Sequence, residues 1–482
     1  MNPSQDLCRY AKRVGRDLSF PPKHIVCVQG MGFVGVAMAL VVANAKDEKK
    51  ELLFNVVGVD LPTHEGKQKI ESINAGKLYF DSVDEKLKEA INRSYKKGNF
   101  FATSEFEVFS LADVIIVDIE LDLEIFDGEP KIDFNNFRSA IKEISLQAKP
   151  GALVIIETTV PPGTCEQIVW PELKTGLKKR NLPEDALLLA HSYERVMPGP
   201  QYFDSIANFW RVYSGYNSQS AKACESFLKK IVNVQSYPLT KLSSLAASET
   251  AKVLENSYRA VNIAFMEEWG SFAEFVGINL FDVIEAIRKR PTHDNIREPG
   301  FGVGGYCLTK DPMFALYSIK NFYEKKDFNF PLTVQGIHIN QKMSENNAKK
   351  LVEIFGGSLH NKTILLLGIS YKEGVSDTRF SPTERFYDLL ISEGAKVICH
   401  DPLVKLWKEK NIKPEQKMPL VKGIDGIVLA VKHSAYKNFD FLKWIENETP
   451  LFFDANNVLS LENKKILNDR GCKVFSVGSG IV

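Results

Sequence analysis

Short runs of apolar residues alternate with amphipathic stretches from about residue 24 to residue 235. Apolar positions within these stretches recur about every three to four residues, as they do along one face of a helix. Strands that alternate with helices predict a parallel sheet covered by helices. The clearest predicted strands are 24–28, 55–60, 113–118 and 152–157.

The strands then stop, and a long helical pattern rich in Ala, Leu, Glu and aromatic residues begins near Leu242. A glycine-rich loop at 299–305 interrupts it, and we expect helices to resume at Pro312. A second alternating region follows Gly356 and Gly357. Its predicted strands are 363–368, 396–400, 426–430 and 451–454.

The first predicted strand runs into the segment Gly30-Met31-Gly32-Phe33-Val34-Gly35. In such a turn the first glycine permits a tight bend, the second lets the backbone approach a pyrophosphate, and the third lets a helix pack on the strand. The phosphate would lie at the helix N-terminus, where free N–H groups attract an anion. The next strand ends in Asp60, which could accept from ribose hydroxyls and repel a 2′-phosphate. This pattern predicts NAD rather than NADP, although a strand-end Asp that only caps a turn is the plainer alternative.

With 482 residues the chain is too long for one compact core. We predict an α/β fold with two Rossmann-like doubly wound parallel sheets, joined by a long central helix and an α-helical middle domain. The two halves echo each other, since each has a strand, a glycine turn and a second strand closing on an acid, Asp60 or Asp401. The expected parts are an N-terminal extension at 1–20, an NAD-binding domain at 21–238, a central helical and dimerisation domain at 239–345, and a C-terminal α/β domain at 346–482.

One alternative is a membrane helix, because His24 to Ala45 carries no Asp, Glu, Lys or Arg. The glycine spacing within this run favours a strand, a phosphate turn and a buried helix instead. The formal net charge of +1 offers no electrostatic footprint for nucleic acid or anionic lipid. Seven scattered cysteines without a paired C-x-x-C spacing indicate a reduced, cytoplasmic setting and no metal site.

Cys307 follows four glycines in six residues, a backbone whose N–H groups could stabilise a thiolate or an oxyanion. Cys27 and Cys399 lie inside strand patterns and are better read as small buried residues. The plainest reading of Asp311 before Pro312 is a helix N-cap. On the long helix, Glu249, Lys252 and Asn256 share one face, for which a solvated polar stripe is the more common explanation.

Taken in order, these segments resemble the UDP-glucose/GDP-mannose dehydrogenase family, the nucleotide-sugar 6-dehydrogenases, from about residue 24 to residue 457. Each segment alone is a weak signal, but the ordered set is highly specific. The matching segments are 30–35 with Asp60, Glu157 to Thr164, Glu194-Arg195 with Pro198-Gly199, Lys252 with Asn256, Gly302 to Asp311, and Lys372 with Asp377 to Pro382.

The resemblance implies a four-electron oxidation of a sugar C6 alcohol to a carboxylate, with two NAD consumed per sugar. An aldehyde would form first, Cys307 would attack it to give a thiohemiacetal and then a thioester, and water would release the acid. Lys252 would stabilise developing oxyanions and Asn256 would orient the sugar or a water. Asp311 and Thr159 would position and activate water.

Other roles implied by the resemblance concern binding. Glu194 would act as an acid/base or substrate contact, with Arg195 and Gly304 also on the sugar side, and Thr159 also near the cofactor. Lys372 and Arg379 match positions at the nucleotide end of a UDP-sugar. The long helix would mediate dimerisation, which implies a homodimer or higher homo-oligomer.

This chain departs from the family pattern at several positions, and the first departure bears on the choice of substrate. UDP-glucose enzymes usually carry a second glutamate where this chain has Pro198, and the Glu-Arg-x-x-Pro-Gly form resembles the UDP-N-acetylhexosamine branch, with Tyr193 replacing its usual proline. Residues 118–121 replace a common Thr-Pro turn near the cofactor. His293 stands where many members have an arginine that reaches the neighbouring subunit. Open candidates to replace it are Arg288, Arg290 and Arg297.

The first hypothesis is therefore a UDP-N-acetylhexosamine 6-dehydrogenase (GlcNAc, ManNAc or GalNAc type) that serves surface-polysaccharide synthesis, and a UDP-glucose 6-dehydrogenase is second. A third reading, from the altered turn at 118–121, is a nucleotide-sugar-binding protein with impaired catalysis. Retention of Cys307, Lys252, Asn256 and Asp311 argues against it. An ordinary two-electron hydroxyacid dehydrogenase would share the first domain but would not need the cysteine loop.

Overall fold

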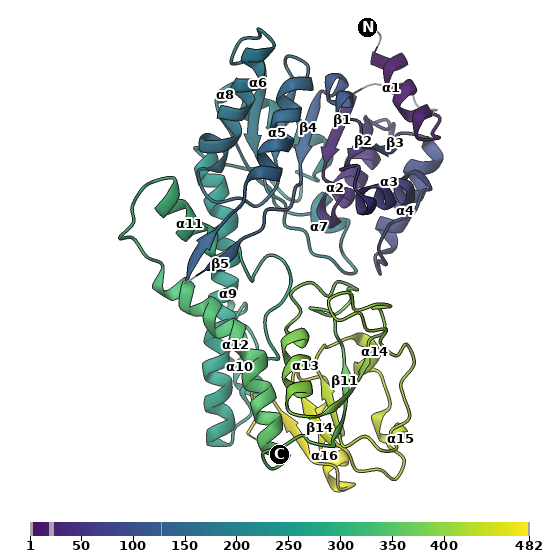
Figure 1. Cartoon of the computed structure of the whole chain (residues 1–482), viewed down its shortest axis with the longest axis vertical. Coiled ribbons are helices and arrows are strands. Elements are labelled where there is room, and N and C mark those ends of the chain that lie inside the picture. The colour runs from purple at the N-terminus through teal and green to yellow at the C-terminus, as the bar shows by residue number, and fades with distance from the viewer. Residues whose placement is uncertain (1–2, 19–23, 127, 481–482) are drawn as a thin grey trace. The chain divides into compact units, whose positions relative to one another are not determined.

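The computed structural model of the chain describes residues 3–18, 24–126 and 128–480. They form two compact units, the first from residues 1–254 and 313–329 and the second from 255–312 and 330–482. The boundary falls within helix α9 (Leu245–Val276), so this helix belongs to both. Each unit contains one large sheet covered by helices, which confirms the predicted α/β class (Figure 1). The further division at 345/346 stays a prediction.

The first unit is built on eight strands. They are β1 (His24–Gln29), β2 (Phe54–Val59), β3 (Phe100–Thr103), β4 (Val114–Val117), β7 (Leu153–Ile156), β8 (Leu188–His191), β9 (Val212–Gly215) and β10 (Thr240–Lys241). Their order is β10-β9-β8-β7-β4-β1-β2-β3, so the six strands from β3 to β8 follow the 3-2-1-4-5-6 order of dinucleotide-binding folds. Each predicted strand of this half is present within about one residue of its expected bounds.

One departure from a purely parallel sheet lies at its edge. Strand β9 runs antiparallel to β8, and β10 pairs parallel to β9. Between β8 and β9 the only helix is α7 (Asp204–Ala207), four residues long. A parallel neighbour needs a long crossover, usually a helix that covers the sheet, whereas an antiparallel one does not.

Helices flank this sheet on both sides (Figure 1). The helices of this unit include α2 (Phe33–Asn44), α3 (His64–Asn74), α4 (Glu85–Lys97), α5 (Asn135–Gln147), α6 (Trp170–Lys179), α8 (Ser218–Ile231) and α11 (Met313–Asn321). The unit also contains the short helical turns η1 (Phe106–Leu111) and η2 (Cys165–Val169), and a hairpin of β5 (Glu124–Phe126) and β6 (Glu129–Lys131). The described part of the predicted N-terminal extension forms α1 (Pro3–Arg13), whose Leu7 and Ala11 are buried in the core of the first unit.

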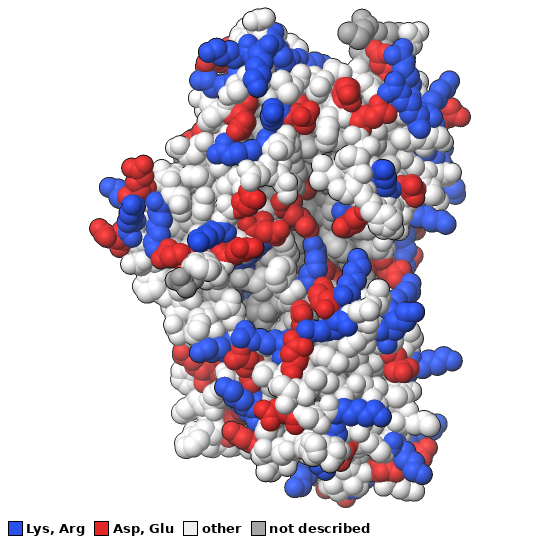
Figure 2. Space-filling view, in the orientation of Figure 1, with Lys and Arg blue, Asp and Glu red and all other residues white. Residues whose placement is uncertain are grey.

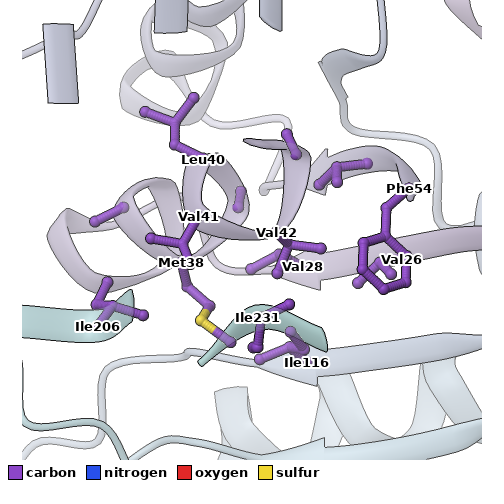
Figure 3. Packing of buried hydrophobic residues seen from close by; sticks show 14 of the residues in the cluster. Val26, Val28, Met38, Leu40, Val41, Val42, Phe54, Ile116, Ile206 and Ile231 are labelled. Atoms are coloured by element: carbon purple, nitrogen blue, oxygen red, sulfur yellow. The ribbon is translucent and has the colours of Figure 1, made fainter. Parts of the chain in front are cut away.

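The charge-free run from His24 to Ala45 is β1, the glycine turn and α2. Helix α2 has only 12 residues, and those from Gly35 to Ala43 are buried. Figure 3 shows Val42 of α2 beside Val28 of β1, and the side chain of Met38 of α2 extending towards Ile231 of α8. Within the described ranges, no helix combines the length and the apolar character that crossing a membrane requires.

Both faces of the strands are buried. In β1, Val26 and Val28 belong to one apolar core, whereas Ile25 and Cys27 belong to the core on the opposite face. Side chains alternate along a strand, so a strand covered on both faces must be apolar at almost every position. This requirement explains the unbroken apolar runs in the sequence.

The second unit contains a wholly parallel five-stranded sheet. Its strands are β11 (Thr363–Leu367), β12 (Lys396–His400), β13 (Gly426–Leu429), β14 (Leu451–Asp454) and β15 (Val474–Ser476). The order β12-β11-β13-β14-β15 is the 2-1-3-4-5 order of the other common doubly wound fold. Its helices, besides α9, are α10 (Leu280–Arg288), η3 (Pro291–His293), α12 (Pro331–Ile354), α13 (Pro382–Ser392), α14 (Ser434–Lys437), α15 (Phe441–Trp444) and α16 (Leu461–Asp469).

The predicted similarity between the two halves, a strand, a glycine turn and a second strand ending in an acid, is confirmed in backbone geometry. After β1, Gly30 has a φ of 94°, and the next N–H donates to Oδ2 of Asp60 at 3.0 Å. After β11, Gly368 has a φ of 97°, and the next N–H donates to Oδ2 of Asp401 at 2.9 Å. Asp401 is fully buried, so its carboxylate serves the turn itself.

Charged residues of both signs are interspersed over the visible face of the molecule (Figure 2). Mixed charge agrees with the formal net charge of +1.

Candidate functional site

The glycine turn of the first unit has the geometry that a dinucleotide requires. A Cβ on Gly30 would lie 2.1 Å from the carbonyl oxygen of Asp118, and one on Gly35 would lie 1.8 Å from the carbonyl oxygen of Gly30. A Cβ on Gly32 would meet nothing within 4 Å. Gly32 is the N-cap of α2 and, as a glycine, supplies no side-chain cap to the first turn of that helix, which begins at Phe33 and Val34. Gly30 and Gly35 are thus tightly packed, whereas the open space at Gly32 leaves room for a pyrophosphate to approach the backbone.

Asp60 closes this turn at the end of β2. Its carboxylate accepts the N–H of Met31 at 3.0 Å and that of Leu61 at 2.8 Å. Each carboxylate oxygen retains a further lone pair that could accept from a ribose hydroxyl. Nζ of Lys69 lies 3.8 Å from Oδ2 of Asp60 and 3.3 Å from Oε1 of Glu65. A cation therefore stands beside the acid that we expect to select NAD.

Four charged side chains gather near the same edge of the sheet, which we call the buried charge cluster: Asp118, Glu157, Glu194 and Arg211. Arg211 forms an ion pair with Glu157 and donates to Ser192. Burial lowers the pKa of Arg211 to about 10, while Asp118 opposes that shift. Only Glu194 of this cluster was identified from the sequence as a site residue. The altered turn at 118–121 was the one signal that pointed to Asp118.

The loop after β7 carries Thr159, which is partly buried. Its neighbour Thr158 accepts the N–H of Ile119 at 2.9 Å, and its hydroxyl lies 3.1 Å from the carbonyl oxygen of Val117. Thr158 therefore holds the turn that follows β4, so the two loops are joined on one side of the glycine turn.

The solvated-stripe explanation of the long helix is wrong. Glu249, Lys252 and Asn256 on α9 are 0%, 7% and 6% exposed. Glu249 accepts the N–H of Gly163 at 2.5 Å and that of Cys165 at 2.8 Å. Burial raises the pKa of Glu249 to about 7, and the hydrogen bonds from Cys165 and Gly163 oppose that rise. Buried polar side chains need partners, and tertiary contacts far along the chain supply them here.

Lys252 is held by Glu194. Its Nζ donates to the backbone carbonyl of Glu194 at 2.7 Å and lies 3.4 Å from Oε1 of the same residue. The sequence placed these two residues in one site, and within the first unit the structure brings them together. Arg195, which we expected on the sugar side, makes hydrogen bonds within the protein. It donates to the carbonyl oxygen of Trp210 at 2.6 Å and to the hydroxyl of Tyr193 at 3.1 Å.

In the second unit, Asn256 and Asp311 meet. Nδ2 of Asn256 donates to Oδ2 of Asp311 at 2.8 Å, and Nζ of Lys310 donates to Oδ1 at 2.8 Å. Asp311 is fully buried. Helix α11 begins at Met313, and the carboxylate expected to cap it is engaged by Asn256 and Lys310 instead. The backbone carbonyl of Cys307 accepts the N–H of Asp311 at 2.9 Å, so one turn carries both groups.

Cys307 is exposed, whereas Cys27 and Cys399 are buried in their strands. Burial raises the pKa of Cys399 to about 12, which keeps its thiol protonated. Among these three, only Cys307 is open to a substrate. The distinction between reactive and packing cysteines drawn from the sequence is confirmed in exposure.

The glycines before Cys307 are explained by packing. A Cβ on Gly304 would lie 2.6 Å from Cδ of Pro382 and 2.7 Å from the carbonyl oxygen of Phe380. Gly305 has a φ of 82°, and its Cβ would lie 2.7 Å from the ring of Tyr371. The loop is pressed against the segment 371–382, which holds the Lys372 and Arg379 matched to the nucleotide end. This proximity of two motifs that lie far apart in the chain was not predicted from the sequence.

Basic side chains gather around Tyr306, next to the cysteine. Nζ of Lys310 lies 4.2 Å from the ring centroid of Tyr306, and the guanidinium of Arg379 lies 5.5 Å from it. Arg379 also pairs with Asp377 at 3.0 Å. Burial, with Arg259 next in size, lowers the pKa of Lys372. A partly buried group of cations suits an anionic ligand such as a diphosphate.

The candidates to replace the cross-subunit arginine differ in their contacts. Arg288 donates to Glu298 at 2.7 Å and to the carbonyl oxygen of Ile296 at 2.7 Å. Burial lowers the pKa of Arg297, whose Nε makes no hydrogen bond to a residue within the described ranges. Nε of Arg288 is buried without a hydrogen bond to the described residues as well, so this donor does not distinguish the two arginines.

Taken together, the first unit offers a dinucleotide turn with a buried lysine, and the second offers an exposed thiol beside an amide, a carboxylate and cations. Lys252 belongs to the first unit, and Asn256, Cys307 and Asp311 belong to the second. Each unit by itself thus carries groups suited to part of the predicted chemistry: the first has a lysine that could stabilise an oxyanion, and the second has a thiol nucleophile with an amide–carboxylate pair.

Known proteins match the whole chain. Residues 24–232, 246–342 and 365–461 match in turn the NAD binding, central and UDP binding domains of the UDP-glucose/GDP-mannose dehydrogenase family. Over 94% of its length the chain is 30% identical to a UDP-N-acetyl-D-mannosamine dehydrogenase of Methanocaldococcus jannaschii, 96% of which is covered.

Two solved structures are also similar. A UDP-D-ManNAc dehydrogenase of Pyrococcus horikoshii has a TM-score of 0.79 and 26% identity, with 95% of this chain and 100% of that one covered. An NDP-N-acetyl-D-galactosaminuronic acid dehydrogenase of Methanosarcina mazei has a TM-score of 0.75 and 25% identity, with 100% and 98% covered.

Proposed function

Because the chain belongs to the UDP-glucose/GDP-mannose dehydrogenase family and is an NAD-dependent nucleotide-sugar dehydrogenase, we propose that it oxidises C6 of a UDP-N-acetylhexosamine to the uronic acid. UDP-N-acetylmannosamine is the first substrate to test. The observation that carries this choice is the similarity over nearly full length to proteins named for that substrate. Pro198, standing where UDP-glucose enzymes have a second glutamate, agrees with it.

The glycine turn and Asp60 would hold NAD, which would supply the hydride acceptor for both oxidation steps. In the first step the C6 alcohol loses a hydride and a proton and becomes an aldehyde. Lys252, buried and anchored to Glu194, stabilises the oxygen as it gains negative charge. Glu194 is placed to exchange the proton, since its carboxylate lies beside that ammonium.

In the second step the thiolate of Cys307 adds to the aldehyde carbon and forms a thiohemiacetal. Loss of a second hydride from C6 leaves a thioester, and water then breaks the carbon–sulfur bond to release the acid and restore the thiol. The fixed pair of Asn256 and Asp311 orients the attacking water, and Thr159 is assigned the same task from its position in the family motif. Lys372 and Arg379 bind the diphosphate of UDP.

Two further proposals concern setting and assembly. The product, an activated uronic acid of an amino sugar, would supply surface-polysaccharide synthesis. The chain would act as a homodimer or higher homo-oligomer through α9, whose exposed apolar side chains include Phe265, Phe272 and Phe275. Sedimentation of the full chain tests the assembly.

The deciding experiment incubates the protein with NAD and a panel of UDP-sugars, and counts the NADH formed per sugar consumed. Two NADH per UDP-N-acetylmannosamine, with UDP-glucose far slower, support the proposal. A preference for UDP-glucose moves the substrate to the second hypothesis. One NADH per sugar contradicts the thioester route, and none across the panel favours a binding protein with impaired catalysis.

A further inference from the structure

Asp118 is an acidic residue next to the glycine turn. It follows β4 directly, and its N–H donates to the carbonyl oxygen of Gln29 at the end of β1. These two neighbouring strands flank the glycine turn. Oδ2 of Asp118 is buried and makes no hydrogen bond with any part of the chain that the structure describes. A buried carboxyl oxygen without a partner costs free energy, so its presence requires an explanation.

Asp118 also forms part of the wall of the dinucleotide turn. Its carbonyl oxygen occupies the place where a Cβ on Gly30 would point, at 2.1 Å, and its own Cβ lies 3.4 Å from where a Cβ on Gly35 would be. The turn is where the pyrophosphate of a dinucleotide binds. The backbone of Asp118 therefore packs directly on the glycine turn, and its side chain begins next to Gly35.

The charged groups around Asp118 balance only if one of the acids carries a proton. The buried charge cluster contains three acids, Asp118, Glu157 and Glu194. Two cations serve them: Arg211 is paired with Glu157, and Lys252 is held by Glu194. Three carboxylates against two cations would leave a net negative charge at an anion-binding turn, and a proton on one acid removes it.

Of the three acids, Asp118 alone makes no ion pair within the described ranges. Burial and the charge of Glu194 raise its pKa well above the usual range, and Arg211 only partly opposes them. On the other side of the turn stands another acid, Asp60, which accepts two backbone N–H groups. The residues of α2 next to the turn carry no charge.

We propose that Asp118, whose backbone walls the dinucleotide turn and whose buried Oδ2 lacks a partner within the described ranges, is a neutral carboxylic acid when NAD is bound, so that NAD binding and protonation of Asp118 are coupled. An ionised carboxylate beside the turn repels the pyrophosphate, whereas the neutral acid does not. The coupling rests on the NAD-binding domain and does not depend on which sugar is oxidised.

The sign of the coupling follows from linkage. Phosphate anions beside Asp118 raise its pKa further in the complex than in the free protein. Below the pKa of the free protein both states carry the proton, and NAD affinity does not change with pH. Between the two pKa values binding takes up a proton, and affinity falls by up to about tenfold per pH unit.

The test measures NAD binding to the full chain by titration calorimetry, without any sugar, over a range of about pH 6 to about pH 9. Titration in two buffers of different ionisation enthalpy gives the number of protons taken up. For the unaltered protein we expect affinity to fall towards alkaline pH, with proton uptake that approaches one per NAD in the same range. This measurement needs no variant.

Asp118→Asn keeps the size and a donor but cannot ionise. It should bind NAD within about threefold of the unaltered protein at neutral pH and should lose both the pH dependence and the proton uptake. Asp118→Ser is a second replacement that cannot ionise, in case the first folds poorly. Glu120→Gln, an exposed change in the same turn, is the matched control and should retain the full pH dependence.

A pH-independent affinity with no proton uptake in the unaltered protein would overturn the proposal. Persistence of the uptake in Asp118→Asn or Asp118→Ser would also overturn it, because another group would then be responsible. Neither result bears on the sugar substrate, which the UDP-sugar panel tests separately.

Discussion

The carboxylate of Glu249, at the start of α9, accepts the backbone N–H of Cys165 at 2.8 Å, although 84 positions separate the two residues. The same carboxylate accepts the N–H of Gly163. The loop that ends at Cys165 begins after β7 and carries Thr159, so one buried acid anchors a loop that we assign to the site. A segment with two prolines and a glycine gains a fixed position from this contact.

Glu249→Gln tests the anchor through pH. The pKa of Glu249 is raised from 4.5 to about 7 by burial, so the folded state prefers its protonated form. Its contribution to stability is complete below the unfolded pKa and is lost as pH rises towards the folded pKa. Urea unfolding at several pH values should show the native protein losing up to about 3 kcal/mol relative to the variant between about pH 4.5 and about pH 7.

The control for this comparison is Glu71→Gln on α3, an exposed glutamate of the same unit. Its stability should follow the unaltered protein at every pH. An identical pH profile for Glu249→Gln and the unaltered protein would show that Glu249 does not titrate in this range.

Asn256 and Asp311 should be energetically coupled. Their hydrogen bond of 2.8 Å is buried and involves an ionisable acid, so removing one partner leaves the other without its bond. A double-mutant cycle of Asn256→Ala and Asp311→Ala, measured by urea unfolding, should give a coupling of about 1–3 kcal/mol.

The pair Lys410 and Asp388 has the same distance of 2.8 Å but lies on the surface of the same unit. Its cycle should give less than about 1 kcal/mol, because exposed ion pairs contribute little. Equal couplings for the buried and the exposed pair would contradict the structural explanation.

Cys307→Ser should stop the conversion at the aldehyde level. A serine hydroxyl is a far weaker nucleophile than a thiolate, so formation of the acid should slow on the order of 10³-fold or more. NAD affinity should stay within about twofold, because the fingerprint turn is unaltered. Acid production is measured by chromatography of the sugar products, with Cys8→Ser as the control. Undiminished acid production in Cys307→Ser would refute the thioester route.

Asp60→Ala should alter the choice of cofactor. Removal of the carboxylate abolishes its repulsion of a 2′-phosphate and leaves Lys69, 3.8 Å from it, without that partner. The ratio of NADP to NAD affinity, measured by fluorescence titration, should rise by about tenfold or more. Glu65→Gln, which alters the other acid near Lys69, should keep the preference for NAD. A constant ratio in Asp60→Ala would remove Asp60 as the selecting residue.

Local pattern was sufficient for the strands and for the glycine turn. Strands buried on both faces must be apolar at successive positions, so β1 and β11 were recognisable without any knowledge of their neighbours. Gly30 and Gly35 were interpretable for the same reason, because the steric demand of the turn acts on the chain itself.

The local sequence pattern gave a wrong prediction for the polar face of α9, because the burial of that face depends on distant segments. Glu249, Lys252 and Asn256 have the spacing of a solvated face, and nothing near them in the chain reveals that the loop after β7, Glu194 and Asp311 cover them. A polar helix face is solvated or buried according to what packs on it, and that is a property of the fold.

By itself the sequence determined which segments become strands, where the phosphate turn lies and which cysteine is set apart from the cores, because each depends on neighbouring residues and on sterics within a few positions. Only the tertiary structure decided that the glycine loop of Cys307 presses on residues 371–382, and that Asp118 and Arg211 join the buried charge cluster. Burial and electrostatic interaction depend on distance in space, which the order of residues along the chain does not specify.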